Sequence, residues 1–153
     1  MKFFLFSIFC SILTSFKPGE PVGTLTCKSE SGRTIFTAIL PSCSYLEKAE
    51  LSVDGSKSSF MTDDATAKVI FDPENKIFTV YIESINQDPK IHKFLQLWAI
   101  PSTFKKTSGK KGPGTEFHDT YAFKAKLFGT DPRKNTDLNT PTIELNCILD
   151  YEL

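Results

Sequence analysis

The residues of this chain that could bind a metal ion are two histidines and the acidic residues near them. The histidines are His92 and His118, and Glu116 lies two positions before His118. Because side chains two positions apart in a strand point to the same face, Glu116 and His118 can reach one cation. A metal site usually needs a third or fourth protein ligand, which His92 would supply only from an adjacent strand. Glu116 and His118 are therefore candidate metal ligands. We favour the alternative, a solvated sheet face, since Thr120 and Lys124 continue the same row.

Disulfide chemistry is the second possibility, because the chain has four cysteines. Cys10 lies in an apolar N-terminal run that we expect to be removed, which leaves an odd number and at most one internal bridge. Cys27 falls in the first predicted strand and Cys147 in the last, each on the apolar face of its strand. We therefore predict a Cys27–Cys147 bridge if the terminal strands are neighbours. A Cys27–Cys43 bridge and three buried free thiols are the alternatives.

No recognisable nucleophile for covalent catalysis is present. The sequence has no Gly-x-Ser-x-Gly elbow, and no cysteine lies in an evidently electropositive setting. Asp63 and Asp64 are paired carboxylates of the kind used in acid–base catalysis, but they fall in a predicted loop that they also keep hydrated. We expect a protein that is not an enzyme and that needs no cofactor. A hydrolase built from carboxylates that meet in the fold is a secondary hypothesis.

A lysine-rich segment is the most unusual part of the chain after its N-terminus. Lys105, Lys106, Lys110 and Lys111 lie in the Gly- and Pro-rich stretch 105–114, which we expect to join two strands. A phosphate-binding P-loop is excluded, because its motif leads into a helix and a strand is predicted to follow here. We interpret the four lysines as candidate contacts for an anionic glycan or an acidic partner. We favour the alternative, a soluble, mobile hairpin tip, because charge runs usually serve solubility.

The lone tryptophan is the other candidate binding residue. Trp98 shares one predicted strand face with Phe94 and Gln96, whereas the opposite face carries only apolar side chains. If the face of Trp98 points outward, it forms an aromatic platform of the kind that stacks on sugar rings. We favour a core position for Trp98, because a lone tryptophan in so apolar a strand is usually buried.

All these candidates must be positioned by β-strands, because apolar and polar residues alternate along most of the chain. The clearest case is the C-terminal segment, where alternate residues from Ile143 to Leu153 are apolar. A period of two is typical of a strand with one buried and one solvated face. By this criterion we expect strands at 22–28, 33–40, 46–53, 66–72, 76–84, 90–100, 115–128 and 141–152, with a short piece near 59–61.

Turn-forming residues separate the predicted strands. Asp72-Pro73-Glu74-Asn75 is typical of a tight turn and predicts a hairpin between 66–72 and 76–84. Asp54-Gly55 is a second hairpin signal. The segment 45–50 has high helix propensity, but it is only about two turns long. Because its apolar residues alternate into the Asp54-Gly55 turn, we predict a strand there.

About eight short antiparallel strands with regularly spaced turns predict an all-β fold. A β-sandwich is favoured, because several strands are apolar on both faces, as expected for central strands covered on both sides. An eight-stranded up-and-down barrel is the alternative, since nearly every connection reads as a hairpin.

The N-terminus has the layout of a secretory signal peptide. Lys2 precedes the apolar run Phe3–Leu13, and the small polar residues Thr14 and Ser15 follow. The run is too short to cross a membrane, which takes about 20 apolar residues. We expect residues 1–16 to be a cleaved leader and residues 17–153 to form one domain without a transmembrane segment. The product would be secreted or periplasmic.

Charge balance narrows the choice of partner. Eighteen Lys and Arg side chains match eighteen Asp and Glu side chains, which excludes the strongly basic surface that nucleic acid attracts. We expect a non-catalytic binding or adhesion module whose partner is a protein, a glycan or a small ligand. A lipocalin-like carrier of a small apolar ligand is the alternative function, ahead of the carboxylate-based hydrolase.

Overall fold

The described part of the chain is built almost entirely of β-strands. The computed structural model describes residues 23–41, 44–86, 88, 92–108, 118–134, 136–137 and 142–152. Within these segments the elements are β1 (Gly23–Lys28), β2 (Thr34–Leu40), β3 (Lys48–Val53), β4 (Ser56–Met61), β5 (Ala65–Asp72), β6 (Ile77–Ser84), β7 (Phe94–Ala99), the 3-10 turn η1 (Pro101–Thr103), β8 (Lys105–Ser108), β9 (His118–Asp131), β10 (Thr136–Asp137) and β11 (Ile143–Glu152). The predicted leader, residues 1–16, lies outside them. No helix among the described residues has the length and apolarity that a membrane crossing requires.

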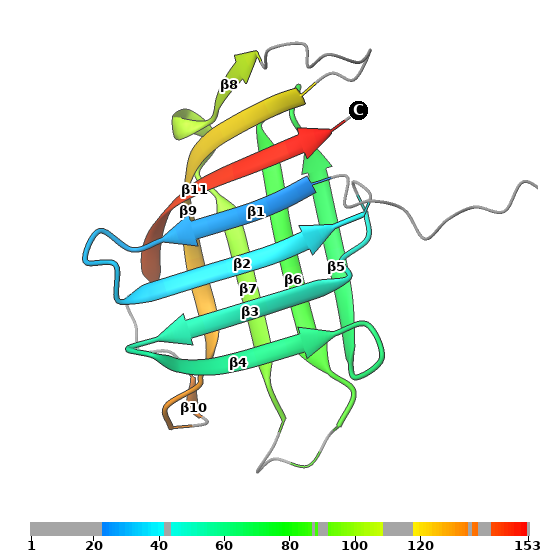
Figure 1. The fold of residues 1–153 in the computed structure, drawn as a ribbon, viewed down its shortest axis with the longest axis vertical. Helices are drawn as coiled ribbons and strands as arrows, with labels where there is room; N and C mark the ends of the chain where they lie inside the picture. The colour runs from blue at the N-terminus through cyan, green and yellow to red at the C-terminus, as the bar shows by residue number, and fades with distance from the viewer. Residues whose placement is uncertain are drawn as a thin grey trace, which may run out of the picture.

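The strands form one antiparallel sheet that rolls back on itself (Figure 1). Its order is β4-β3-β2-β1-β11-β9-β7-β6-β5, and β8 and β10 each pair with a further part of β9. In the ribbon, β1–β4 and β11 form one layer, and β5–β7 form a second layer that runs at a steep angle behind it. The long, curved β9 joins the two layers. The prediction of an all-β fold is confirmed, and the architecture is a nearly closed barrel whose two layers face each other as in a sandwich.

The space between the two layers is filled with large apolar side chains. Phe36 from β2 and Phe78 from β6 are at most 1% exposed. The other large side chains with less than 2% exposure are Leu25, Leu51, Ile82, Leu95, Leu97, Leu127, Leu145, Leu149 and Val80. Burying a side chain of this size stabilises the fold by about 1.5–3 kcal/mol. Among the described residues, the interior is therefore a packed core and not an open cavity.

The predicted strands and turns agree closely with the structure. All eight predicted strands are present, and the short piece near 59–61 is part of a full strand, β4. The segment 45–50 is not helical, and its second half opens β3. Asp54 and Gly55 both have positive φ, 50° and 85°, as a two-residue hairpin turn of type I′ requires. At the β5–β6 turn, the Asp72 carboxylate accepts a hydrogen bond from the backbone N–H of Asn75 at 3.1 Å.

Two structural predictions, on the coverage of one strand and on the lysine-rich segment, are wrong. Strands apolar on both faces were expected to be covered on both sides, yet β5 is an edge strand and its outward Ile70 is 45% exposed. Lys105 and Lys106 belong to a strand, β8, and not to a loop. β8 forms because β9 extends beyond its pairing with β7 and leaves residues 119–122 free to pair with another strand.

The disulfide prediction is confirmed. Cys27 and Cys147 are bridged, and they lie directly opposite each other in the β1–β11 pair. This bridge excludes a Cys27–Cys43 pairing, and Cys43 itself lies outside the described residues. The bond connects the first and the last described strands, which are neighbours in one layer, and both cysteines are at most 2% exposed.

Candidate functional site

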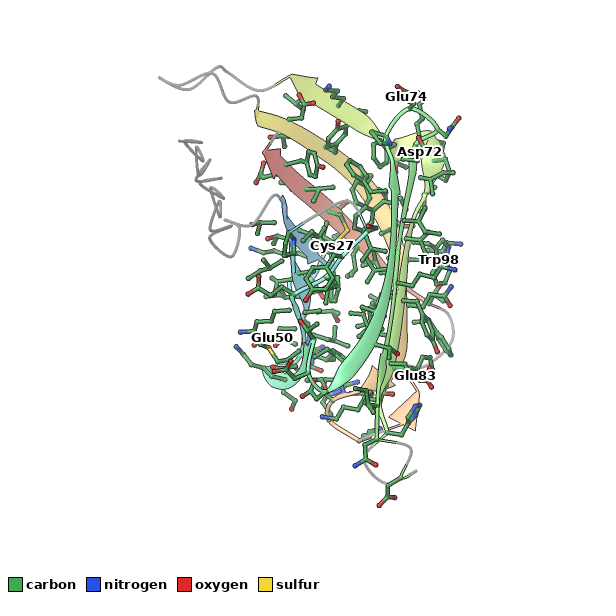
Figure 2. All side chains as sticks on the ribbon, turned by 90° about the vertical axis from the view of Figure 1, so that its right-hand side faces the viewer. Cys27, Glu50, Asp72, Glu74, Glu83 and Trp98 are labelled. Carbon is green, nitrogen blue, oxygen red and sulfur yellow. A yellow bond between two sulfur atoms is a disulfide. The ribbon has the colours of Figure 1, made fainter. Side chains whose placement is uncertain are left out.

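Aromatic and aliphatic side chains gather on the outer face of β5, β6, β7 and β9, which we call the aromatic face. At its centre, Trp98 of β7 lies between Thr79 of β6 and Lys126 of β9 in the strand register. Because directly paired residues point to the same side of a sheet, these three side chains form one outward row. Figure 2 shows Trp98 on the side of the molecule that faces away from the β1–β4 layer. The core position favoured for Trp98 is wrong, since this side chain is only half-buried.

A second row of the aromatic face lies beside the row of Trp98. Gln96, two positions from Trp98, lies between Tyr81 of β6 and Phe128 of β9. The ring of Phe128 packs on that of Phe94, with centroids 5.5 Å apart. Tyr81 is 38% exposed. The two rows therefore present aromatic rings at close spacing, with polar side chains between them.

Hydrogen bonds hold the Tyr81 end of the aromatic face in place. The Tyr81 hydroxyl donates to Glu83 Oε2 at 2.9 Å, and Glu83 Oε1 lies 2.9 Å from His92 Nε2. These two partners, Tyr81 first, lower the pKa of the Glu83 carboxyl, so it stays ionised at neutral pH. The same contact raises the pKa of Tyr81. Glu83 thus fixes the Tyr81 ring and adds a negative charge at the rim of the face.

The outer face of the other layer has a different composition. Along β1–β4, the outward positions carry threonine, serine, lysine and glutamate, with Ile35, Ile39 and Met61 as apolar members. No aromatic residue occupies an outward position in these four strands. Such a mixed polar surface is typical of a solvated sheet face. Outward aromatic residues in the described strands are therefore confined to β6, β7 and β9.

The candidate lysines do not act as one group in the described structure. Lys105 points outward and borders a depression of about 480 Å³ that Lys124 and Ile148 also line. Lys106 points to the inner side of the sheet, where its Nζ lies 2.6 Å from Asp119 Oδ2. Lys110 and Lys111 lie outside the described residues.

The predicted metal site is left untested. Glu116 lies outside the described residues, and only the backbone of His118 is described, at the start of β9. His92, the proposed third ligand, is paired with Glu83. Among the described residues, no cluster of three or more His, Cys, Asp or Glu side chains could hold a metal ion.

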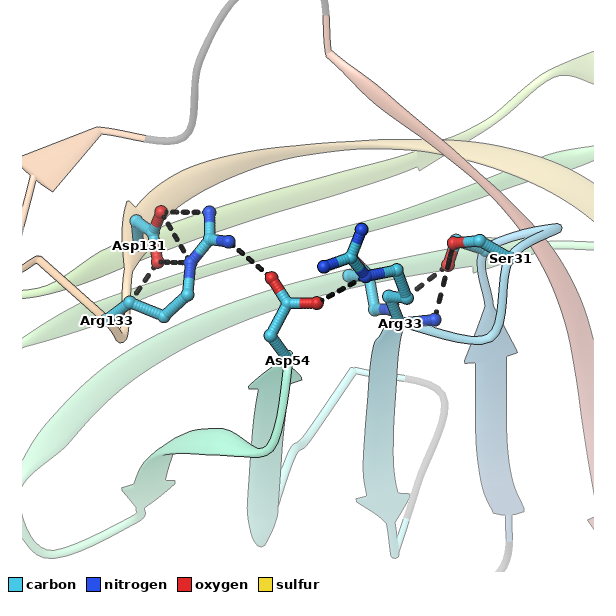
Figure 3. A network of polar contacts seen from close by, with 7 residues as sticks. Ser31, Arg33, Asp54, Asp131 and Arg133 are labelled. Carbon is cyan, nitrogen blue, oxygen red and sulfur yellow. Dashed lines mark hydrogen bonds and ion pairs between the residues drawn. The ribbon is translucent and has the colours of Figure 1, made fainter.

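A chain of four charged groups at the end of the molecule where β9 pairs with β10 was not predicted (Figure 3). Arg33 Nε binds Asp54 Oδ1 at 2.6 Å, and the other oxygen of Asp54 binds Arg133. Arg133 also binds the buried carboxylate of Asp131 through two nitrogens, at 2.6 and 3.0 Å. The hydrogen bonds from Arg133 lower the pKa of Asp131. Since every charge in the network has an opposite partner, we interpret it as a clamp that joins the β1–β2, β3–β4 and β9–β10 turns.

The candidate functional site is thus a surface feature, and its side chains come from four neighbouring strands. Trp98 was the one site residue of this face that the sequence singled out. Comparison with protein-family models, with curated proteins and with solved structures found no match to this chain.

Proposed function

We propose that this protein is an exported, non-catalytic binding module that contacts a glycan through the aromatic face around Trp98. The single observation that carries the proposal is the outward, half-buried position of Trp98 among other exposed aromatic and aliphatic side chains. Contiguous exposed apolar surface of this kind usually marks an interaction site. Export is supported by the N-terminal sequence pattern and by the Cys27–Cys147 bridge, since disulfides persist in oxidising compartments.

The spacing of the aromatic face supports a glycan. Neighbouring strands lie about 4.8 Å apart, so Tyr81 and Phe128, two strands apart, are separated by roughly 10 Å. Trp98 and Gln96 are separated along β7 by about 7 Å. Sugar rings have apolar C–H faces and hydroxyl edges, and a glycan chain therefore suits rings that alternate with amide, hydroxyl and charged groups. Gln96, Thr79 and Glu83 supply those groups here.

The exposed aliphatic residues suggest a competing partner of a different class. Ile70 and Ile77 are 45% and 41% exposed on the same face, and aliphatic side chains pack well against proteins. We favour the glycan because polar residues interrupt the face throughout, whereas the centres of protein interfaces are depleted of charged residues. A protein partner, or a second copy of this chain, is an outcome that the experiment below can detect.

The proposal can be tested by intrinsic fluorescence, because Trp98 is the only tryptophan in the chain. The purified protein is titrated with soluble cello-, chito-, xylo- and manno-oligosaccharides while Trp98 emission is recorded. Tyr81→Ala and Phe128→Ala keep the reporter and should each weaken binding between about two- and tenfold, since an aromatic contact contributes about 0.5–1.5 kcal/mol. Tyr45→Ala is the matched control, because Tyr45 is an aromatic residue with 44% exposure away from the aromatic face.

Three results would contradict the glycan. An unchanged Trp98 emission with every oligosaccharide and no retention on immobilised polysaccharides would remove the proposed ligand class. Equal weakening by Tyr45→Ala would show that binding does not depend on this face. A dimer in native mass spectrometry that Trp98→Ala dissociates would assign the face to a second copy of the chain.

A further inference from the structure

A hollow of about 430 Å³ lies next to the β5–β6 turn, on the inner side of the β8–β9 pair and so across the sheet from the aromatic face. One wall is formed by Phe104, Lys106, Asp119 and Tyr121 around β8 and β9, and the other by the β5–β6 turn with Pro73, Glu74 and Lys76. In Figure 2 the β5–β6 turn, marked by Asp72 and Glu74, stands at the same end of the molecule as β8. The volume is in the range that small-molecule sites occupy.

The floor of the hollow is aromatic and held by packing. Phe104 stacks on Phe123 with ring centroids 5.0 Å apart and lies 5.7 Å from the Tyr121 ring. The Phe71 ring also packs against Tyr121, with ring centroids 5.2 Å apart. Because these rings are fixed by one another, the floor exists before any ligand arrives, which reduces the ordering cost of binding.

A lysine brings positive charge to this floor. The β8–β9 register pairs Lys106 with Tyr121, so both side chains point to the inner side of the sheet. The Lys106 ammonium lies 2.6 Å from Asp119 Oδ2 and 5.8 Å from the centre of the Tyr121 ring. Its hydrogen bond to Asp119 raises its pKa, so the group stays protonated at neutral pH. An ammonium has three N–H donors; the bond to Asp119 uses one of them, and the Tyr121 hydroxyl is a second partner within the protein.

We propose that this hollow binds a small anion with an aromatic or alicyclic ring. The ring lies on Phe104 and Tyr121, and the anionic group accepts hydrogen bonds from Lys106, with Lys76 as a second cation on the opposite wall. This site is independent of the aromatic face. The competing explanation is that an inward lysine on the edge strand β8 prevents pairing with other chains, which would need no ligand.

The test uses two fluorescent probes with the same aromatic framework and different charge. 1-Anilinonaphthalene-8-sulfonate carries a sulfonate, and N-phenyl-1-naphthylamine is its uncharged analogue. We expect the sulfonate to bind the folded protein with 1:1 stoichiometry and Lys106→Met to weaken it about tenfold. The uncharged probe should bind more weakly to wild type and be insensitive to this variant. Lys106→Arg, which keeps the charge, should retain binding.

The matched control is the neighbouring lysine. Lys105→Met removes the same charge from the same strand, but Lys105 points to the outer side and should not affect either probe. If Lys106→Met fails to fold, Lys76→Met on the exposed turn supplies the second variant, with a severalfold loss of sulfonate affinity expected. Equal effects of Lys105→Met and Lys106→Met would overturn the proposal. So would sulfonate binding that is lost in Trp98→Ala and kept in Lys106→Met, because the probe would then lie on the aromatic face.

Discussion

Reducing the Cys27–Cys147 disulfide should cause a large loss of stability, and the size of that loss follows from the position of the two cysteines. They are 120 positions apart in sequence, so the bridge closes nearly the whole folded chain into one loop. In the chain-entropy description, a loop of this length restricts the unfolded state by about 5 kcal/mol at 25 °C. A folded part of about 130 residues has an unfolding entropy of about 0.27 kcal/mol/K. Reduction should therefore lower the melting temperature by up to roughly 18 °C.

Thermal unfolding of one protein in its oxidised and reduced forms measures this effect without changing the core. The control is the Cys27→Ala/Cys147→Ala double variant, which retains Cys43. It should melt near the reduced wild type and should not respond to reductant. A response of the double variant would show that another thiol is involved.

Two results would refute the reasoning. A shift below about 5 °C would mean that the bridge contributes little more than about 1 kcal/mol, so the unfolded chain is not restricted by it as calculated. Loss of the β-sheet circular dichroism signal on reduction at 10 °C would mean that the bridge maintains the native sheet itself. At that temperature the hydrogen bonds and packing of β1 against β11 should suffice to keep the sheet folded without the bridge.

The remaining predictions concern a buried charge and a close strand contact. Asp131→Asn should destabilise the protein by about 2–3 kcal/mol in urea denaturation, because it removes the buried carboxylate that binds Arg133. The control is Glu144→Gln, which removes an exposed ion pair with Lys124 and should change the stability little. Since Arg133 lowers the pKa of Asp131 in the folded state, this stabilisation is complete above about pH 4 and is lost as pH falls through the folded pKa. Acid unfolding should accordingly depend more steeply on pH in wild type than in the Asn variant. Gly129→Ala should lower the free energy of unfolding by about 1–3 kcal/mol, because an added Cβ would lie 2.5 Å from a backbone oxygen of β7. Gly23→Ala should be less destabilising, because the atoms nearest to its Cβ would be side-chain carbons, at 3.3 and 3.4 Å.

The strands and the disulfide could be predicted from the sequence, because both depend on local alternation. In β11, alternate apolar residues identify the buried face, and Cys147 shares that face. The same criterion places Cys27 on the buried face of β1. The sequence did not show that the two strands are neighbours, and the antiparallel β1–β11 pair in the structure establishes this.

Trp98 was predicted to point into the core and points outward, although the sequence contains a signal for the outward direction. Leu95 and Leu97 are fully buried, and their face of β7 carries no polar residue. The face of Trp98 also carries Gln96, a polar group that would need a partner in a core. When both faces of a strand are rich in apolar residues, the face with a polar interruption is the better candidate for the outer surface.

The charged clamp and the hollow could not be derived from the sequence. Arg33, Asp54 and Arg133 come from three turns that the topology brings together, and nothing in their local sequence indicates the contact. The inward direction of Lys106 likewise depends on the register of β8 against β9, which exists only because β9 extends past β7. Both features are determined by tertiary structure.

The distribution of exposed apolar residues supports a binding role in a way that does not depend on the identity of the ligand. An exposed, apolar edge strand promotes pairing with other chains and aggregation. β5 is an edge strand, and it exposes Ile70 beside Ile77 and Tyr81 of β6. The β4 edge of the same sheet is rich in serine and carries a lysine. β4 also ends on the exposed Met61, and β5 carries Lys68, but the large exposed side chains Ile70, Ile77 and Tyr81 cluster on the β5–β6 side. We infer that this part of the aromatic face is covered when the protein binds its partner.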